Sequence, residues 1–168
     1  AGAEDAVVRF RERYFDVGWA ENVVFEGVPE ALVALRLLGF HLGIATSKPT
    51  EPARRIADHF GLSPHLDFVA GASLDGSRDA KADIIAWARS EFGAGDGWMV
   101  GDRSHDIVGG RDQGLETIGV LWGYGSHSEL SGAGATHLAS NPAELVSVLA
   151  KAGPSKRNAS SGSPHRSE

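Results

Sequence analysis

The sequence predicts an α/β fold in which helices flank a parallel sheet. Short apolar runs of strand length alternate with longer stretches of helical periodicity between residues 23 and 150. This alternation favours parallel strands joined by right-handed helical crossovers, which gives a Rossmann-like sheet. The predicted strands, in chain order, cover residues 41–46, 67–73, 97–102, 116–122 and 135–140, and the last of these is a short edge strand.

The predicted helices are identified by apolar residues at three-four spacing and by proline or glycine at their ends. Residues 4–17 carry such a pattern. A short helix begins near Pro29 and stops at Gly39, and another begins near Pro52 and ends at Gly61. Further helices are predicted over residues 80–92, 104–113 and 142–150.

The composition excludes several classes of function. The hydrophobic content of 42% and the charged content of 23% are ordinary for a soluble globular protein, and no apolar run approaches the roughly 20 residues of a membrane span. The net charge of -6, with no long basic run outside the tail, argues against a nucleic-acid surface. The absence of cysteine excludes disulfides, thiolate metal sites and cysteine nucleophiles. Because the N-terminus lacks a signal layout, we expect a cytoplasmic protein without nucleic-acid or membrane partners. The tail, residues 151–168, is rich in Ser, Gly and Pro, and we predict that it is disordered.

Polar residues gather near the carboxyl ends of the predicted strands, where ligands bind to open parallel sheets. Thr46, Ser47 and Lys48 follow the first strand. Each of them has an ordinary alternative role, as a turn hydroxyl or a hydrated cation. Lys81 resists such an explanation, because the dipole of its helix disfavours a cation in the first turn by a few tenths to about 1 kcal/mol. A bound anion would reverse that preference, so we predict that these four residues bind phosphate.

Two carboxylates follow the third strand. Asp102 and Asp106 are four residues apart, so they lie on one side of a helical turn and repel each other mildly. Asp102 follows a buried strand and needs a partner there. Asp106 has the alternative of favouring a helix N-terminus, with Ser104 as the N-cap. Since Mg²⁺ takes one or two carboxylates together with waters and phosphate oxygens, we predict a metal site with Asp102 as a direct ligand and Asp106 acting directly or through water.

The order of these motifs resembles the haloacid dehalogenase superfamily. There, a threonine or serine after a strand binds phosphate, a later lysine stabilises the phosphoryl charge and the nucleophile, and a "GDxxxD" pattern binds Mg²⁺. Thr46, Lys81 and "GDRSHD" with Asp102 and Asp106 occupy these places. "TSKP", "LWGYGSHSEL" and "ATHLASNPAEL" are similar to the phosphoglycolate phosphatase branch. The resemblance implies a hydrolase core over residues 23–150, the last helix of a small helical cap over residues 1–22, catalytic roles for Thr46 and Lys81, and Mg²⁺ as cofactor.

One motif of the superfamily does not occur in these 168 residues. It is a strand ending in "DxDGT", whose first aspartate attacks phosphorus; "LDGS" at 74–77 lacks the preceding Asp-x and follows a different strand. In the family's sheet this strand lies centrally, between the strands that end at Thr46 and Asp102. We therefore expect a gap in the sheet, no nucleophile in this chain, and either a truncated sequence or a strand supplied from elsewhere.

The function implied is Mg²⁺-dependent hydrolysis of a phosphomonoester through a phosphoaspartate. The expected substrate is a small phosphorylated metabolite such as phosphoglycolate, with pyrophosphate or a nucleoside monophosphate as alternatives, and the chain alone is expected to be inactive. The alternative function is a non-catalytic phosphate- or Mg²⁺-binding remnant. A signalling receiver domain fits less well, because its acid pair follows the first strand, and a dehydrogenase fits poorly, because no "GxGxxG" follows a strand. The oligomeric state is left open.

Overall fold

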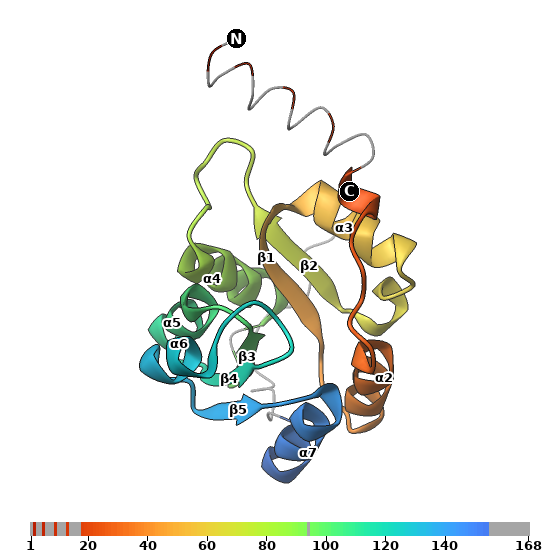
Figure 1. Ribbon diagram of the computed structural model, residues 1–168, viewed down its shortest axis with the longest axis vertical. Helices are drawn as coiled ribbons and strands as arrows, with labels where there is room; N and C mark the ends of the chain where they lie inside the picture. The colour runs from red at the N-terminus through yellow and green to blue at the C-terminus, as the bar shows by residue number, and fades with distance from the viewer. Residues whose placement is uncertain are drawn as a thin grey trace, which may run out of the picture.

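The computed structural model describes residues 18–93 and 95–154, together with residues 2, 5, 9 and 13. Its strands alternate with helices along the chain, and every strand pair in the described residues is parallel, which confirms the predicted fold class (Figure 1). Most of the predicted helix over residues 4–17 lies outside the described residues. Residues 155–168 of the predicted tail also lie outside them. The strands are β1 (Gly43–Pro49), β2 (Phe68–Ala72), β3 (Trp98–Gly101), β4 (Glu116–Val120) and β5 (His137–Ala139).

The strands form two sheets. β1 pairs with β2, and the second sheet has the order β3-β4-β5. β1 and β3 are therefore edge strands within the described part of the chain, and they correspond to the two predicted strands that end at Thr46 and Asp102, between which a gap is expected. They do not pair with each other there.

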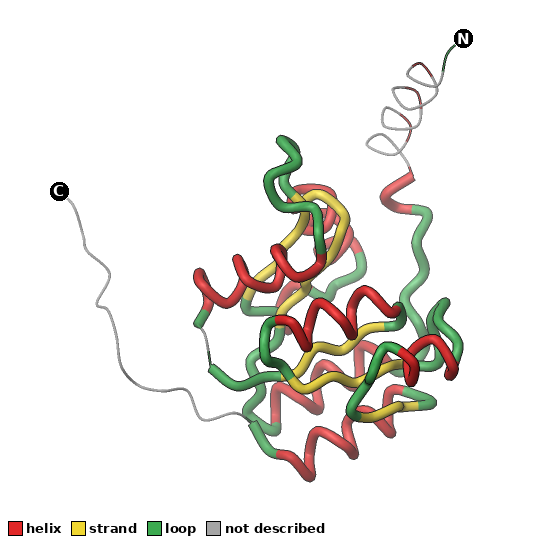
Figure 2. The backbone as a smooth tube through the Cα atoms, turned by 90° about the vertical axis from the view of Figure 1, so that its left-hand side faces the viewer, coloured by secondary structure: helices red, strands yellow, loops and turns green. Residues whose placement is uncertain are grey.

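Helices cover both faces of each sheet (Figures 1 and 2). α3 and α4 lie on opposite sides of the β1–β2 sheet, and Ile84 and Ala88 of α4 pack with Ala70 of β2 in one core. A second core joins α2 and α7 to β4 and β5 and contains Leu35 and Ile118. The helices, in chain order, are η1 (Gly18–Ala20), α2 (Val28–Leu37), α3 (Thr50–His59), η2 (Ser63–His65), α4 (Lys81–Phe92), α5 (Ser104–Asp112), α6 (His127–Gly132) and α7 (Pro142–Ala152).

The structure differs from the predicted elements in several places, which include the short helices η1 and η2. β1 continues to Pro49, with an irregular register after Thr46, so Thr46, Ser47 and Lys48 lie within the strand rather than after it. Helix α6 was not predicted. α7 extends two residues beyond the predicted end at residue 150, so the prediction of a disordered tail from residue 151 is wrong for Lys151 and Ala152, which continue the helix. In the described part of the chain, no helix is both long and apolar enough to cross a membrane.

Candidate active site

Lys81, the first residue of α4, connects the predicted phosphate and metal residues. Its Nζ donates to the backbone carbonyl oxygen of Ala45 in β1 at 2.9 Å and lies 2.9 Å from Oδ1 of Asp106 in α5. The side chains of Lys81 and Asp106 are only 9% and 7% exposed. The two groups thus form a buried ion pair next to the residue that precedes Thr46.

This ion pair corrects the reasoning from which an anion site was predicted. The cation at the start of α4 was expected to need a bound anion, whereas the carboxylate of Asp106 already compensates for it. The close approach depends on Gly109, since a Cβ atom there would lie 2.9 Å from Cγ of Lys81. The charge of Lys81 is therefore neutralised within the chain before any ligand binds.

Asp106 caps the N-terminus of α5, which is the alternative to metal binding given above. Its Oδ2 accepts a hydrogen bond from the backbone N–H of Arg103 at 3.1 Å, and the N-cap of α5 is Arg103 rather than Ser104. Its Oδ1 faces Lys81 and also lies 3.6 Å from Nε2 of His105. Both carboxylate oxygens therefore have partners inside the protein.

Asp102 lies directly after β3 and is held by the segment between β4 and α6. Its Oδ2 accepts a hydrogen bond from the backbone N–H of Tyr124 at 2.8 Å. A Cβ atom at Gly123 would overlap with the Asp102 side chain, and one at Gly125 would overlap with the Asp102 carbonyl oxygen. Asp102 is half-buried, and its Oδ1 has no hydrogen-bond partner in the described residues. This oxygen is the carboxylate atom of the site that is left for a ligand.

The carboxylates of this site suit Mg²⁺, which keeps several water ligands, better than a metal ion that is coordinated by protein side chains alone. No group of three acidic or histidine side chains that could hold an ion occurs in the part of the chain that the structure describes. Mg²⁺ prefers hard oxygen ligands and retains several waters, so one carboxylate oxygen from Asp102 is compatible with it. Asp106 fits a contact through water, because Lys81 and Arg103 already occupy its oxygens.

Thr46, Ser47 and Lys48, the other residues of the predicted phosphate site, are less closely connected to Lys81. Oγ1 of Thr46 accepts a hydrogen bond from the backbone N–H of Lys48 at 3.2 Å, which is the turn-like role considered as an alternative. Ser47 and Lys48 are exposed. Among the described residues, no hydrogen bond or ion pair connects Ser47 or the Lys48 side chain to Lys81.

Glu129 in α6 belongs to the same region and was not predicted. Its Oε1 accepts hydrogen bonds from the backbone N–H of Ser104 at 2.9 Å and from Nε of Arg103 at 3.0 Å. The Ser104 N–H, together with the Arg103 guanidinium, lowers the pKa of Glu129 to about 2. A signal for α6 was present in the sequence, because Ser126 and Glu129 have the S-x-x-E spacing of a capping box, and the Ser126 hydroxyl accepts the Glu129 N–H.

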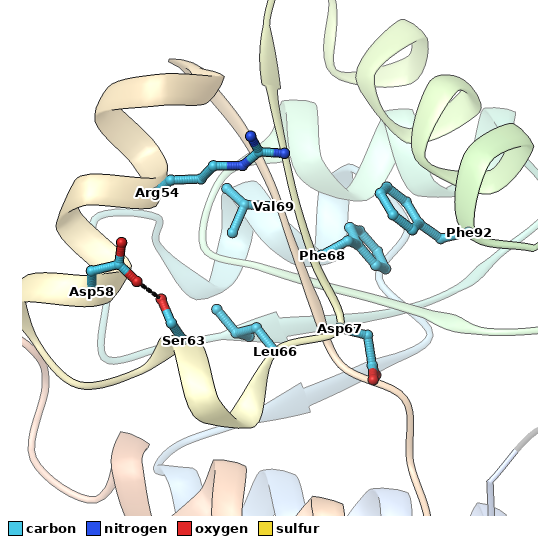
Figure 3. A pocket seen from close by; sticks show the side chains of 8 residues that line it. All are labelled: Arg54, Asp58, Ser63, Leu66, Asp67, Phe68, Val69 and Phe92. Atoms are coloured by element: carbon cyan, nitrogen blue, oxygen red, sulfur yellow. Dashed lines mark hydrogen bonds between the residues drawn. The ribbon is translucent and has the colours of Figure 1, made fainter.

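A pocket of about 280 Å³ lies away from these residues, beside β2 (Figure 3). Arg54, Asp58 and Ser63 line it on the side of α3 and η2, and Asp58 accepts a hydrogen bond from Ser63. Phe68 and Phe92 stack with their centroids 4.5 Å apart on its other side. None of its lining residues is a predicted site residue, so the candidate site rests on the Lys81–Asp106–Asp102 geometry instead.

Comparisons with known proteins identify the family of this chain. Residues 1–114 match the family model described as haloacid dehalogenase-like hydrolase, and residues 78–152 match a second model of the same type. The chain is 46% identical over 125 residues to the tyrosine-protein kinase PtkA of Mycobacterium tuberculosis, covering 73% of this chain and 43% of the kinase. It is 42% identical over 151 residues to a 5'-nucleotidase of Pseudomonas aeruginosa, covering 89% and 68% of the two chains. It is 32% identical over 152 residues to a plasmid-encoded phosphoglycolate phosphatase of Cupriavidus necator, covering 89% and 66%.

A solved structure, described as a predicted phosphatase from Clostridium acetobutylicum, superimposes with a TM-score of 0.82 at 37% identity and covers 85% of this chain and 67% of that one. The chain thus spans less than half the length of the kinase and about two thirds of the other proteins compared. The family model alone covers well over half of the present sequence. The chain belongs to the haloacid dehalogenase-like hydrolase family.

Proposed function

We propose that this chain supplies the phosphate- and metal-binding part of a Mg²⁺-dependent phosphomonoester hydrolase. The observation that carries the proposal is the buried Lys81–Asp106 pair beside β1, together with Asp102, which directly follows β3 and lies four residues before Asp106 in the chain. A fixed cation and a carboxylate oxygen available to a metal ion are the electrostatic elements that phosphoryl transfer requires.

The proposed roles follow from these positions. The Lys81 ammonium, whose contacts with Asp106 and the Ala45 carbonyl oxygen use two of its three N–H donors, donates the third to an equatorial oxygen of the transferring phosphoryl group. Thr46 donates a hydrogen bond to another of these oxygens. Asp102 binds Mg²⁺ directly and Asp106 binds it through water, while Asp106 also keeps Lys81 in place. Mg²⁺, when bound, supplies further positive charge to the phosphate oxygens. Ser47 and Lys48 are proposed as additional phosphate contacts, for which their exposure at the end of β1 leaves room.

The reaction needs a nucleophile that these 168 residues do not provide in a "DxDGT" strand. In the proposed reaction, an aspartate carboxylate attacks phosphorus, the bond from phosphorus to the ester oxygen breaks, and the leaving alkoxide takes a proton from a general acid. Water then cleaves the phosphoaspartate to inorganic phosphate and restores the carboxylate. We place the strand that carries this aspartate at the edges of β1 and β3 that have no partner strand among the described residues. We therefore propose that the chain alone has no turnover.

Small phosphorylated metabolites are the proposed substrates. The relatives are named for phosphoglycolate and for 5'-nucleotides, so phosphoglycolate and nucleoside 5'-monophosphates are the first candidates. The 46% identity to a tyrosine-protein kinase supports a second candidate, transfer of the phosphoryl group to a protein tyrosine instead of water. The same cation and carboxylates would serve either acceptor. A non-catalytic phosphate- or Mg²⁺-binding role is the remaining alternative.

The test compares the 168-residue chain with the same chain joined to a segment that carries a "DxDGT" strand. Phosphate release is measured from phosphoglycolate and from nucleoside monophosphates, and phosphotyrosine formation is measured with ATP and a tyrosine peptide. We expect no turnover by the chain alone, and Mg²⁺-dependent phosphate release by the extended protein that is lost in Asp102→Asn. Phosphotyrosine as the main product would favour the kinase candidate. Failure of the extended protein in both assays would favour the non-catalytic alternative, and turnover by the chain alone would reveal a nucleophile within it.

A further inference from the structure

Helix α6 is attached to the beginning of α5 by one carboxylate. Oε1 of Glu129 accepts both the backbone N–H of Ser104, which is the first residue of α5, and Nε of Arg103. The first N–H groups of a helix have no partner within the helix, so a carboxylate from another element satisfies one of them and also interacts favourably with the helix dipole. Glu129 therefore fixes where α5 begins.

The same segment surrounds Asp102. Between β4 and α6, Gly123 and Gly125 approach Asp102 so closely that neither position accommodates a Cβ atom without overlap, and the N–H of Tyr124 holds Oδ2 of Asp102. The contacts of Glu129 with Arg103 and Ser104 lie one and two residues beyond Asp102 along the chain. Asp102 is thus held on one side by the turn before α6 and on the other by the attachment of α6 to α5.

We infer that Glu129 is a positioning residue for Asp102, an inference that rests on the metal site of the proposed function. By fixing Arg103 and Ser104 against α6, Glu129 keeps the Asp102 carboxylate at the Tyr124 N–H and leaves its Oδ1 directed to a ligand. Groups that orient a metal ligand typically change metal affinity 10- to 100-fold when they are removed. A residue that only stabilised the fold would change the stability and leave the affinity of the folded protein unaltered.

The chain offers a matched control at another helix. Oε2 of Glu144 accepts the backbone N–H of Ser140 at 2.7 Å, just before α7, so this carboxylate has the same kind of partner as Glu129. α7 packs against α2 in the second core and does not carry any predicted site residue. Glu144→Ala should therefore cost stability in a similar way without affecting Asp102.

The experiment measures the Mg²⁺ dissociation constant of the folded 168-residue chain by isothermal titration calorimetry, with thermal unfolding measured in parallel. We expect Glu129→Ala to raise the dissociation constant about 10-fold or more. Glu129→Gln should raise it less, because its amide oxygen still accepts the Ser104 N–H. Glu144→Ala should leave it within about twofold of the wild type. If Glu129→Ala does not fold, Glu129→Gln replaces it, and the inference then requires a Mg²⁺ dissociation constant for Glu129→Gln that is higher than that of Glu144→Ala.

Asp102→Asn separates this inference from the proposed function. If Asp102→Asn weakens Mg²⁺ binding and the Glu129 variants do not, Glu129 has no positioning role although the metal site stands. Equal weakening by Glu129→Ala and Glu144→Ala would also overturn the inference, because it would reflect general destabilisation. If Asp102→Asn binds Mg²⁺ as the wild type does, the metal site itself is wrong and the inference fails with it.

Discussion

The ion pair between Lys81 and Asp106 is the contact whose disruption we expect to cost the most stability. Both side chains are less than 10% exposed, and Asp106→Asn would leave the Lys81 ammonium buried without a counter-charge. Removing one partner of a buried pair costs about 3 to 5 kcal/mol, a large share of the roughly 5 to 15 kcal/mol by which domains are usually stable. The hydrogen bond from Lys81 Nζ to the Ala45 carbonyl oxygen remains but does not neutralise the charge. We therefore expect a loss of at least about 3 kcal/mol in the free energy of unfolding.

Urea denaturation followed by circular dichroism measures this loss, and a double-mutant cycle assigns it to the pair. Asp106→Asn combined with Lys81→Met removes both charges, so the double variant should lose at least about 1 kcal/mol less than the sum of the single variants. Glu21→Gln is the control, because it disrupts the Arg13–Glu21 pair, whose side chains are 64% and 55% exposed, and should change stability little. A loss below about 1 kcal/mol for Asp106→Asn, or strict additivity in the cycle, would refute the buried ion pair.

Two further predictions concern the segment around Asp102. Gly123→Ala should raise the Mg²⁺ dissociation constant at least about 10-fold, because the added Cβ displaces Asp102. Gly132→Ala is the control and should leave the constant unchanged, because no neighbouring atom lies within 4 Å of the new Cβ. Equal calorimetric affinities of the two variants for Mg²⁺ would contradict this prediction. Acid unfolding should depend on Glu129. Its pKa is lowered from 4.5 to about 2 in the folded protein, so its contribution to stability is fully present above about pH 4.5 and is lost as the pH falls toward 2. Glu129→Gln should therefore unfold with a weaker pH dependence between pH 4.5 and 2 than the wild type, and superimposable acid-unfolding curves would show that the carboxylate is not stabilised by the fold.

Most of the fold could be predicted from the sequence because its signals are local. Glycines end α2, α3 and α4 where the pattern predicts, and Gly39, Gly61 and Gly93 all adopt the positive φ that favours glycine. In the part of the chain that the structure describes, β1 and β3 are not paired with each other, as expected from the motif that the sequence lacks. The extension of β1 past Thr46 was not, because the irregular register there depends on pairing with β2 rather than on the residues of β1 alone.

The site could be predicted only in part because its contacts join distant segments. The sequence places Lys81 and Asp106 at the starts of two helices, but no local sequence pattern indicates that their side chains, 25 residues apart in the chain, form an ion pair. The contact of Glu129 with Ser104 spans a similar separation. Asp102 was predicted as a ligand, but the turn that holds it is recognised only from the structure, in which Gly123 and Gly125 lie directly against Asp102. Residue types and spacing thus indicate the chemistry, while the packing of α4, α5 and α6 decides which groups are paired and which are available.

The most direct test of the site is a calorimetric Mg²⁺ titration of the wild-type chain and of Asp102→Asn. Oδ1 of Asp102 lacks a partner in the described residues, and the amide of asparagine removes the charge while keeping an acceptor for the Tyr124 N–H. We predict that Asp102→Asn raises the Mg²⁺ dissociation constant at least about 10-fold, which corresponds to about 1.4 kcal/mol of binding free energy. Equal affinities of the two proteins for Mg²⁺ would contradict the proposed metal site and, with it, the assignment of this region as the phosphoryl-transfer centre.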